Sequence, residues 1–567
     1  MIPALPQFMW LVIAGSFTSF LYGYATGSND LGNAFGTSVG SKTLTLRQAV
    51  FIASIFEFAG SLLLGRVTSN IIAGDIANVA TFKDDPAIYA YGMVCSLLVG
   101  GVWQLLCSRW ELNVSSTYTI IACIMGFSFV WGGPTAVNWA TWDPKLVPPY
   151  GGVVPIFLAW IISPVFTGII SGLMMLAMRT FILRRHNNNL LAIFTLPVSL
   201  FITSWINIFF ILTKGAGKML ATTSDWSVGK SVWVTTASSI GATALIGGII
   251  CPLLYRRVKL REIKDVTPPP TLSVTPTDVT STIVVVEVVP IEPIPVRTNT
   301  NASDLKHLIS SQASSLSVTP PPSSPSSQLL QPLSPPSFPH PQTPFQMAAT
   351  SAMTKIKYIF NRIKTRALHG ISVNVHDLSA VDEDVRAMYD HAEKFDPTVE
   401  YVYTWLQVFS AICVIFAHGA NEVGYMAGPL TAIYDVYQTN QLSKSVSPSI
   451  WIIIICAVGL VMGLATYGYN VMRAMGVKLA VLSPSRGFCI ELSTALVILV
   501  ASQIGLPVSS SLAVVGGIVG VGLLEGRKGV NWKFFIKQIV SWVTTMAVCS
   551  LFTAALFAQG IYAPSRN

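Results

Sequence analysis

The chain has 567 residues, of which 52% are hydrophobic and only 11% are charged, and its mean hydropathy is +0.59. Soluble domains carry about 25% charged residues, so this composition excludes an ordinary soluble protein and indicates several apolar membrane segments of about 20 residues each. The net charge of +9 does not indicate nucleic-acid binding, because the basic residues follow the membrane topology derived below. The eight cysteines lie in or beside apolar segments, so we interpret them as small buried hydrophobes and expect no disulfide framework or zinc site.

Apolar segments of membrane-spanning length recur along the whole chain. Seven precede a long polar segment, near residues 8–25, 48–65, 87–107, 112–131, 153–178, 188–213 and 231–255. Five follow it, near residues 401–417, 449–469, 487–504, 508–524 and 534–558. We therefore expect an all-α, polytopic membrane protein of about twelve transmembrane helices in three parts: an N-terminal membrane half over 1–255, a segment over 256–400, and a C-terminal membrane half over 401–567.

The segment over 256–400 is rich in Pro, Ser and Thr, as in "TPPPTLSVTPTD" over 267–278. It cannot bury enough apolar surface to fold, so we expect it to be mostly disordered, with room for a surface helix near its end. Lys and Arg in the short loops follow the positive-inside rule if both termini lie outside the membrane. This orientation places the long segment in the cytoplasm.

The first apolar segment becomes polar while still at membrane depth, in "GSNDLGNAFG" over residues 27–36. A similar stretch, "GANEVGYMAG", occupies 419–428, where Asn421 aligns with Asn29 and Glu422 with Asp30. Carboxylates inside a membrane are costly and usually functional, and broken backbone is tolerated there only where it lines a polar cavity. We therefore expect a polar break in the helix at both places, in preference to glycines that serve packing alone.

A second pair of motifs carries hydroxyl clusters. Ser115, Ser116 and Thr117 of "NVSSTYTIIACIMGF" align with Ser509, Ser510 and Ser511 of "PVSSSLAVVGGIVGV". Seven spans separate the starts of the two copies, and because this number is odd, the copies face opposite ways across the membrane. An inverted-topology repeat with interrupted or re-entrant helices is the architecture of secondary transporters. Hydroxyls that bond only to their own helix or its neighbour are the competing interpretation of these clusters.

The chemistry of the two motif pairs indicates coupled transport. Helix N-termini and hydroxyls suit an oxyanion, whereas amide oxygens and the carboxylates of Asp30 and Glu422 suit a hard cation such as sodium. Carboxylates repel an anion unless a cation lies between them, which implies symport. Glu57 and Glu491 are mid-helix carboxylates that we interpret as cation ligands, proton carriers or structural partners of buried hydroxyls. We interpret His418 as a packing or interface residue in preference to a proton relay.

The motifs resemble those of the inorganic phosphate transporter family. "GSNDLGNAFGTSVGSKTLTLRQAVFIASIFEFAGSLLLG" and "FAHGANEVGYMAGPLTAI" are similar to its two signatures, and the resemblance covers nearly every apolar segment. It implies a transporter, often a homodimer and located in the plasma membrane, that imports inorganic phosphate with sodium as a co-transported substrate and without a cofactor. It also implies site residues: for phosphate Asn29, Asp30, Ser115, Ser116, Thr117, Asn421, Ser509, Ser510 and Ser511; for sodium Asp30, Asn33, Asn421 and Glu422; for coupling Glu57 and Glu491.

The sequence departs from the family pattern at several positions. Glu422 stands where the family has Asp, Tyr425 where it has Asn, and Tyr118 and Leu512 where it has His. These departures keep three alternatives open: coupling to protons, a different oxyanion, and a transport-inactive receptor or sensor. An enzyme is not indicated, because the sequence contains no Walker-type loop, metal-binding Cys/His pattern or nucleophile elbow.

Overall fold

The computed structural model describes residues 6–66, 69, 72, 76–142, 149–185, 188–216, 227–266, 376, 383–443, 447–503 and 508–563. Within these ranges the chain is helical, apart from connections and one short antiparallel ribbon that pairs Thr141 with Gly151 and Trp142 with Tyr150. This confirms the all-α class. The expected disorder of the Pro-rich segment falls on residues 267–375, which lie outside the described ranges.

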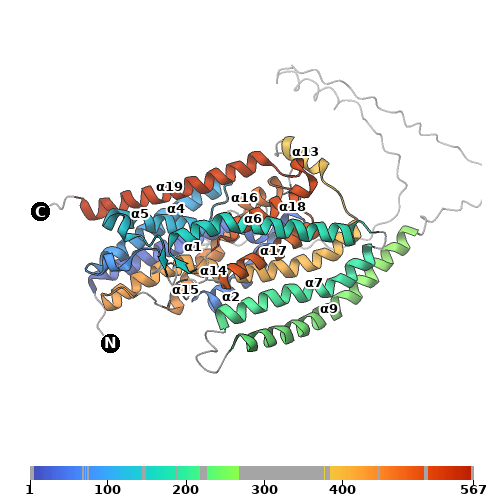
Figure 1. Cartoon of the computed structure of the whole chain (residues 1–567), viewed down its shortest axis with the longest axis horizontal. Coiled ribbons are helices and arrows are strands. Elements are labelled where there is room, and N and C mark those ends of the chain that lie inside the picture. Colours follow the sequence, from blue (N-terminus) through green and yellow to red (C-terminus); the bar gives the residue numbers. More distant parts are fainter. Residues whose placement is uncertain are drawn as a thin grey trace, which may run out of the picture. The chain divides into compact units, whose positions relative to one another are not determined.

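The N-terminal half contains η1 (Pro6–Phe8), α1 (Met9–Gly40), α2 (Leu46–Leu64), η2 (Val79–Phe82), α4 (Pro86–Arg109), α5 (Ser116–Gly132), η3 (Gly133–Ala136), β1 (Thr141–Trp142), β2 (Tyr150–Gly151), α6 (Val153–Met178), η4 (Arg179–Leu183), α7 (Asn188–Phe210), η5 (Ile211–Ala216) and α9 (Val228–Val266). The remainder contains α13 (Glu383–His391), α14 (Pro397–Thr439), α15 (Ile450–Tyr467), α16 (Tyr469–Arg473), η7 (Ala474–Lys478), α17 (Pro484–Gln503), α18 (Ser510–Gly522), η8 (Leu523–Glu525), η9 (Arg527–Gly529) and α19 (Trp532–Tyr562). The membrane helices pack into a bundle in which α7 and α9 lie side by side (Figure 1).

Among the described residues, ten helices are long and apolar enough to cross a membrane, fewer than the twelve expected. All seven segments before residue 256 are among them. The two that are missing are α17 and α18, and α18 is only 13 residues long. A helix of this length rises about 20 Å, which is too short for a hydrocarbon core of about 30 Å. The expected span over 508–524 is therefore a half-helix. It starts only at Ser510, within the hydroxyl cluster, with Ser509 as its N-cap residue.

Two helical hairpins, α4–α5 and α17–α18, carry the two hydroxyl clusters at the starts of their second helices. In the first, α4 and α5 lie antiparallel, so that Tyr89 near the start of α4 packs against Phe127 near the end of α5, with ring centroids 5.8 Å apart. In the second, Arg486 at the start of α17 pairs with Glu525 just beyond α18, at 2.7 Å. α5 lies toward the left end of the bundle and α18 toward the right (Figure 1). The hairpins therefore approach each other from opposite ends of the molecule.

The helices α1 and α14, which carry the two glycine-rich motifs, pack against each other in opposite directions. Near the start of α1, Ser19 Oγ donates to the Met426 carbonyl in the second half of α14, at 3.4 Å. Just beyond the end of α1, Ser41 Oγ donates to Gln407 Oε1 near the start of α14, at 2.8 Å. The two copies of the motif are thus antiparallel, as expected for copies that face opposite ways.

A cluster of ion pairs joins the residues after the long polar segment to the ends of the membrane helices. Glu393 accepts two hydrogen bonds from the Arg184 guanidinium, both at 2.8 Å, and lies 3.2 Å from Arg179 Nε beyond α6. Arg486 of α17, which is 97% buried, donates to Glu525 and to the Glu393 carbonyl at 2.7 and 2.9 Å. These contacts fasten the start of the C-terminal half to both α6 and the second hairpin.

Replacing Glu393 by glutamine weakens this ion-pair cluster, so we expect the free energy of unfolding to fall by on the order of 1 kcal/mol. Hydrogen bonds from Arg184, together with the charge of Arg179, hold the pKa of the Glu393 carboxyl below its ordinary value. Its stabilising effect is therefore complete above the ordinary glutamate pKa of about 4.3, and it is lost as the pH falls through the lowered value in the folded state.

Thermal unfolding of the wild type and E393Q at pH 7 and near pH 3.5 measures this effect. The difference in Tm should be present at pH 7 and smaller at the lower pH. The matched control is Asp384→Asn, because Asp384 pairs with Lys533 through side chains that are 55% and 85% exposed. A difference in Tm for E393Q that does not exceed that of the control would contradict the assignment.

Candidate functional site

The two glycine-rich motifs are helical throughout, so the expected breaks in the backbone at 27–36 and 419–428 are wrong. Their glycines instead allow neighbouring helices to approach closely. A Cβ on Gly27 would lie 1.9 Å from the Leu460 carbonyl oxygen of α15, and one on Gly419 would lie 2.2 Å from the Glu57 carbonyl oxygen of α2. Asn29, Asn33 and Glu422 bond with residues of the hairpins while the helices of both motifs continue.

The carboxylate of Asp30 lies between α1 and the start of α18. Asn33 Nδ2 donates to Asp30 Oδ1 at 2.6 Å and to Ser511 Oγ at 2.7 Å, and Ser511 Oγ donates to the same Asp30 oxygen at 3.4 Å. Asn113, in the loop of the first hairpin, donates to Asn33 Oδ1 at 2.7 Å. The sequence interpretation missed Asn113, which does align with the start of the second hydroxyl motif.

The carboxylate of Glu422 joins the starts of both hairpin helices. Ser116 Oγ, in the first turn of α5, donates a short hydrogen bond to Glu422 Oε2. Ser510 Oγ, in the first turn of α18, donates to Glu422 Oε1 at 3.2 Å. The extra methylene of Glu422, relative to the aspartate of the family pattern, lengthens the reach from α14 toward these two hydroxyls. The structure therefore brings together one residue from each of the two hydroxyl clusters.

The tips of the two hairpins meet at their N-cap residues. Ser509 Oγ donates to Ser115 Oγ at 2.8 Å, and each oxygen also caps its own helix by accepting from the backbone N–H of Tyr118 or Leu512. Thr117 is buried in the first turn of α5. The positive ends of two helix dipoles thus converge on one place, where they favour negative charge.

His418 lies among three carboxylates, although we interpreted it from the sequence as a packing residue. Its Nδ1 is 2.9 Å from Glu57 Oε1, and its Nε2 is 3.9 Å from Asp30 Oδ2 and 3.8 Å from Glu422 Oε1. The signal that could have found it is its position four residues before Glu422, which puts both side chains on one helix face. All four side chains are at least 94% buried.

We call His418, Asp30, Glu57 and Glu422 the carboxylate cluster. Three polar atoms of this cluster are buried without a hydrogen-bond partner: Asp30 Oδ2, Glu57 Oε2 and His418 Nε2. One ligand atom from each of Asp30, His418 and Glu422 lies within 4.8 Å of the others. Buried carboxylate oxygens are costly unless they are paired or bind a cation. Oxygen ligands suit hard cations, so the cluster fits a cation held between Asp30 and Glu422.

Asn29 and Asn421 have different surroundings, although their motifs align. Asn29 holds the tip of the first hairpin, because its Oδ1 accepts from the Val114 N–H and its Nδ2 donates to the Leu112 carbonyl, both at 2.9 Å. Asn421 Nδ2 donates to the Tyr425 hydroxyl at 3.0 Å. Tyr425, one of the departures from the family pattern, is therefore a direct partner of a predicted site residue.

Glu491 lies in a separate polar cluster. It accepts hydrogen bonds from Thr37 and Ser38 at the end of α1, at 2.7 and 2.8 Å, and from Gln407 and Ser410 near the start of α14. None of these four donors belongs to the group around Asp30. Glu57 therefore lies in the group with His418, Asp30 and Glu422. Glu491 lies outside this group and accepts hydrogen bonds from four uncharged side chains.

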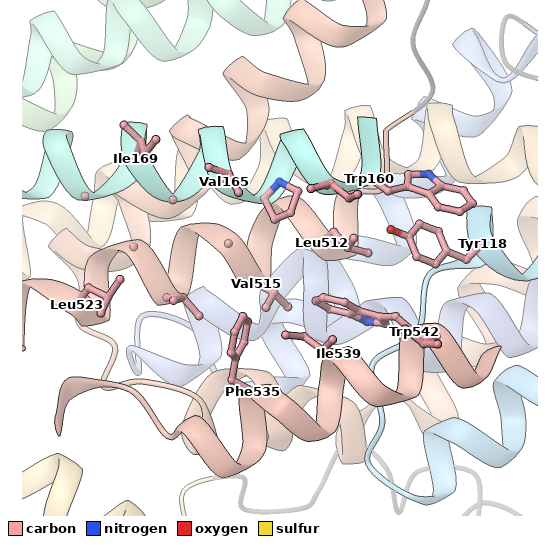
Figure 2. Close-up of a pocket in the computed structure, with 18 of the residues that line it drawn as sticks. Tyr118, Trp160, Val165, Ile169, Leu512, Val515, Leu523, Phe535, Ile539 and Trp542 are labelled. Atoms are coloured by element: carbon pink, nitrogen blue, oxygen red, sulfur yellow. The ribbon is translucent and has the colours of Figure 1, made fainter. Parts of the chain in front are cut away.

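A cavity of about 1080 Å³ is separate from the group formed by His418 and the three carboxylates. It lies between α6, α18 and α19 and is lined by apolar side chains, with no charged residue among its described lining (Figure 2). Tyr118 and Leu512, the two replacements of family histidines, both line it, and the Tyr118 ring packs on Trp160 with centroids 3.6 Å apart. In this chain, both positions are therefore parts of the wall of an apolar cavity.

The fold and the site together define a class of membrane protein. Its bundle encloses two opposed hairpins, whose helix N-termini suit an anion, beside buried carboxylates that suit a cation. This is the arrangement of a secondary active transporter. In agreement with it, the model of the phosphate transporter family matches residues 26–553, and the chain belongs to this family. It is accordingly a transporter and not an enzyme.

Relatives match along almost the entire chain. The phosphate-repressible phosphate permease pho-4 of Neurospora crassa is 27% identical over 99% of both chains. The sodium-dependent phosphate transporter 1 of Mus musculus is 27% identical over 97% of this chain and 95% of its own, and that of Homo sapiens is 26% identical over 98% and 96%. A solved structure, the sodium-dependent phosphate transporter, matches with a TM-score of 0.65 at 21% identity, over 98% of this chain and 100% of that one, which shows a shared fold.

Proposed function

We propose that this protein imports inorganic phosphate by symport with sodium ions through alternating access. The observation that carries the proposal is the position of Asp30 and Glu422 beside the two converging helix N-termini. Phosphate suits the helix ends and their hydroxyls, but the two carboxylates repel it. A sodium ion between the carboxylates removes this repulsion, so each substrate favours binding of the other. The names of the mammalian relatives support sodium as the coupling ion.

In this proposal, sodium binds to Asp30, Asn33, Asn421 and Glu422, and phosphate to the hydroxyls of Ser115, Ser116, Thr117, Ser509, Ser510 and Ser511 with help from Asn29, Asp30 and Asn421. Glu57 and Glu491 act as coupling carboxylates. Glu57 is suited to this role by its contact with His418, which links it to both sodium-binding carboxylates. Glu491 is suited to it by its hydrogen bonds to α1 and α14, the two helices that carry the sodium ligands.

We also propose that the two membrane halves, residues 1–255 and 401–567, contain an inverted repeat. The packing of the elements supports it: α1 packs on α15 as α14 packs on α2, and α5 packs on α19 as α18 packs on α6. The start of α1 and the end of α19 meet around Tyr91, which contacts both Trp10 and Phe557, and the end of α9 lies at the opposite end of the bundle (Figure 1). This agrees with both termini outside and the long segment in the cytoplasm. A homodimer in the plasma membrane is proposed on the family resemblance alone.

A specific observation favours proton coupling as the second candidate. His418 contacts Glu57 directly and lies within 3.9 Å of Asp30 and Glu422. These four side chains form a connected set of groups that can each carry a proton. In this alternative, protons bound to the set neutralise the carboxylates in place of sodium.

Uptake of radiolabelled phosphate by proteoliposomes that contain the purified protein tests the proposal. With an inward sodium gradient and no proton gradient, we expect uptake that increases with sodium concentration and stops when potassium replaces sodium. Uptake driven by a proton gradient without sodium would support the second candidate. Absence of uptake under both gradients, from protein that elutes as a single folded species, would contradict phosphate symport.

A further inference from the structure

Beside the carboxylate cluster lies a small cavity of about 30 Å³ that the assigned site residues only partly enclose. Its inner wall contains Asn33, His418, Asn421 and Ser510. Its outer wall comes from α7 and α17, neither of which carries a predicted phosphate ligand, and includes Asn207 and Thr494.

The lining of this cavity suits an anion better than a cation. None of its described lining residues is an aspartate or glutamate, whereas hydroxyls, amides and the His418 ring project polar groups from several elements. Thr494 Oγ1 and His418 Nε2 are buried without hydrogen-bond partners, in side chains that are 99% and 94% buried. The cavity also adjoins Ser510, the first residue of α18, whose dipole is positive at this end.

A second cavity, of about 250 Å³, lies between α7, α9 and α14 and is lined mostly by apolar side chains. It shares three lining residues with the first, Asn207, Phe210 and Ala417, so these form the partition between the two. The smaller cavity has room for water, and a phosphate ion is several times larger than water. A phosphate ion can therefore occupy this place only if the partition moves. Phe210 is only partly buried, and the helix changes to a π-helical turn directly after it, as is common at functional positions.

Building on the proposed function, we propose that the small cavity is a binding station for phosphate that adjoins the assigned site and adds Thr494 and Asn207 to its phosphate ligands. Thr494 and Asn207 hold the anion there by hydrogen bonds, and Phe210 closes the passage behind it.

The test measures phosphate uptake as a function of phosphate and sodium concentration for Thr494→Val and Asn207→Leu. A lost hydrogen bond to a charged ligand should raise the KM for phosphate about tenfold in each variant. The maximal rate and the sodium concentration for half-maximal uptake should stay within about twofold of the wild type. Thr494→Ser, which keeps the hydroxyl, should restore the wild-type KM. The matched control is Thr203→Val, because Thr203 is buried on α7 but lines neither cavity.

An unchanged phosphate KM in both variants would overturn the station, as would an equal rise in the Thr203→Val control. Because wild-type uptake is measured in the same series, failure of the proposed function appears as a wild type without uptake, which is a different outcome. A second measurement does not depend on KM. In a Cys413→Ser background, which removes the native thiol that lines the outer cavity, a small thiol reagent should block uptake by Phe210→Cys. Unimpaired uptake after complete labelling would contradict a passage at Phe210.

Discussion

Replacing Asp30 by asparagine is expected to reduce sodium-driven phosphate uptake by at least about 100-fold. Loss of a residue that only supports a metal ligand costs up to about 100-fold, and loss of the ligand itself should cost at least as much. The substitution keeps the size of the side chain and an oxygen that Asn33 and Ser511 can reach, so the local packing is preserved. It removes the negative charge that faces His418 and the Glu422 carboxylate. Without that charge, the cluster attracts sodium more weakly, and the phosphate ion loses the cation that offsets the repulsion from Glu422.

Uptake by proteoliposomes at several sodium concentrations measures the effect, with protein content and elution profile matched to the wild type. The control is Asp435→Asn, because Asp435 is a buried carboxylate on α14 that accepts from the Ser443 N–H at 3.2 Å, away from the site. We expect the control to transport at a rate within about twofold of the wild type. If the Asp30 variant transported at a rate comparable to the control, the first motif would have no role in coupling.

Replacing Gly27 by alanine is expected to lower the stability of the fold strongly. The added Cβ would lie 1.9 Å from the Leu460 carbonyl oxygen, and this atom belongs to the backbone of α15, which cannot move aside as a flexible side chain does. The contact is reciprocal, because a Cβ on Gly463 of α15 would lie 1.8 Å from the Tyr24 carbonyl oxygen of α1. Overpacking a core costs about 1–3 kcal/mol when side chains can adjust, so a backbone clash should cost about 3 kcal/mol or more.

Thermal unfolding of detergent-purified protein, followed by size-exclusion fluorescence, measures this loss of stability. The control is Gly241→Ala on α9, because a Cβ at Gly241 meets no atom within 4 Å. Alanine favours a helix over glycine by about 1 kcal/mol, so the control should have an unchanged or higher Tm. A Gly27→Ala variant as stable as this control would mean that α1 and α15 do not pack as closely as the structure indicates.

Several features of the site could be predicted from the sequence. The sequence alignment paired Asp30 with Glu422 and one hydroxyl cluster with the other, and in the structure Ser116 and Ser510, one from each cluster, both contact Glu422. Two repeated motifs in an apolar context leave few other places where polar side chains can be satisfied. The direct contact between Ser115 and Ser509 could not be predicted, because it depends on where in space the first turns of α5 and α18 lie.

Other features depend on long-range packing that local patterns do not contain. Glycine and polar residues suggested a break in α1 and α14, but in both helices the glycines face a neighbouring backbone and the helix continues. Glu57 and Glu491 appeared equivalent as mid-helix carboxylates, yet only Glu57 meets His418. Which partner each one finds is decided by helices more than 80 residues away in sequence.

The sequence by itself determined the membrane class, the seven apolar segments of the first half and the residue types of the site, because hydropathy and motif identity are properties of short stretches of chain. Only the tertiary structure decided that the hairpins meet at Ser115 and Ser509, that His418 lies among three carboxylates, and that α7 covers the site with Asn207. The physical reason is that these contacts join segments far apart in the chain, and their geometry follows from how closely whole helices pack.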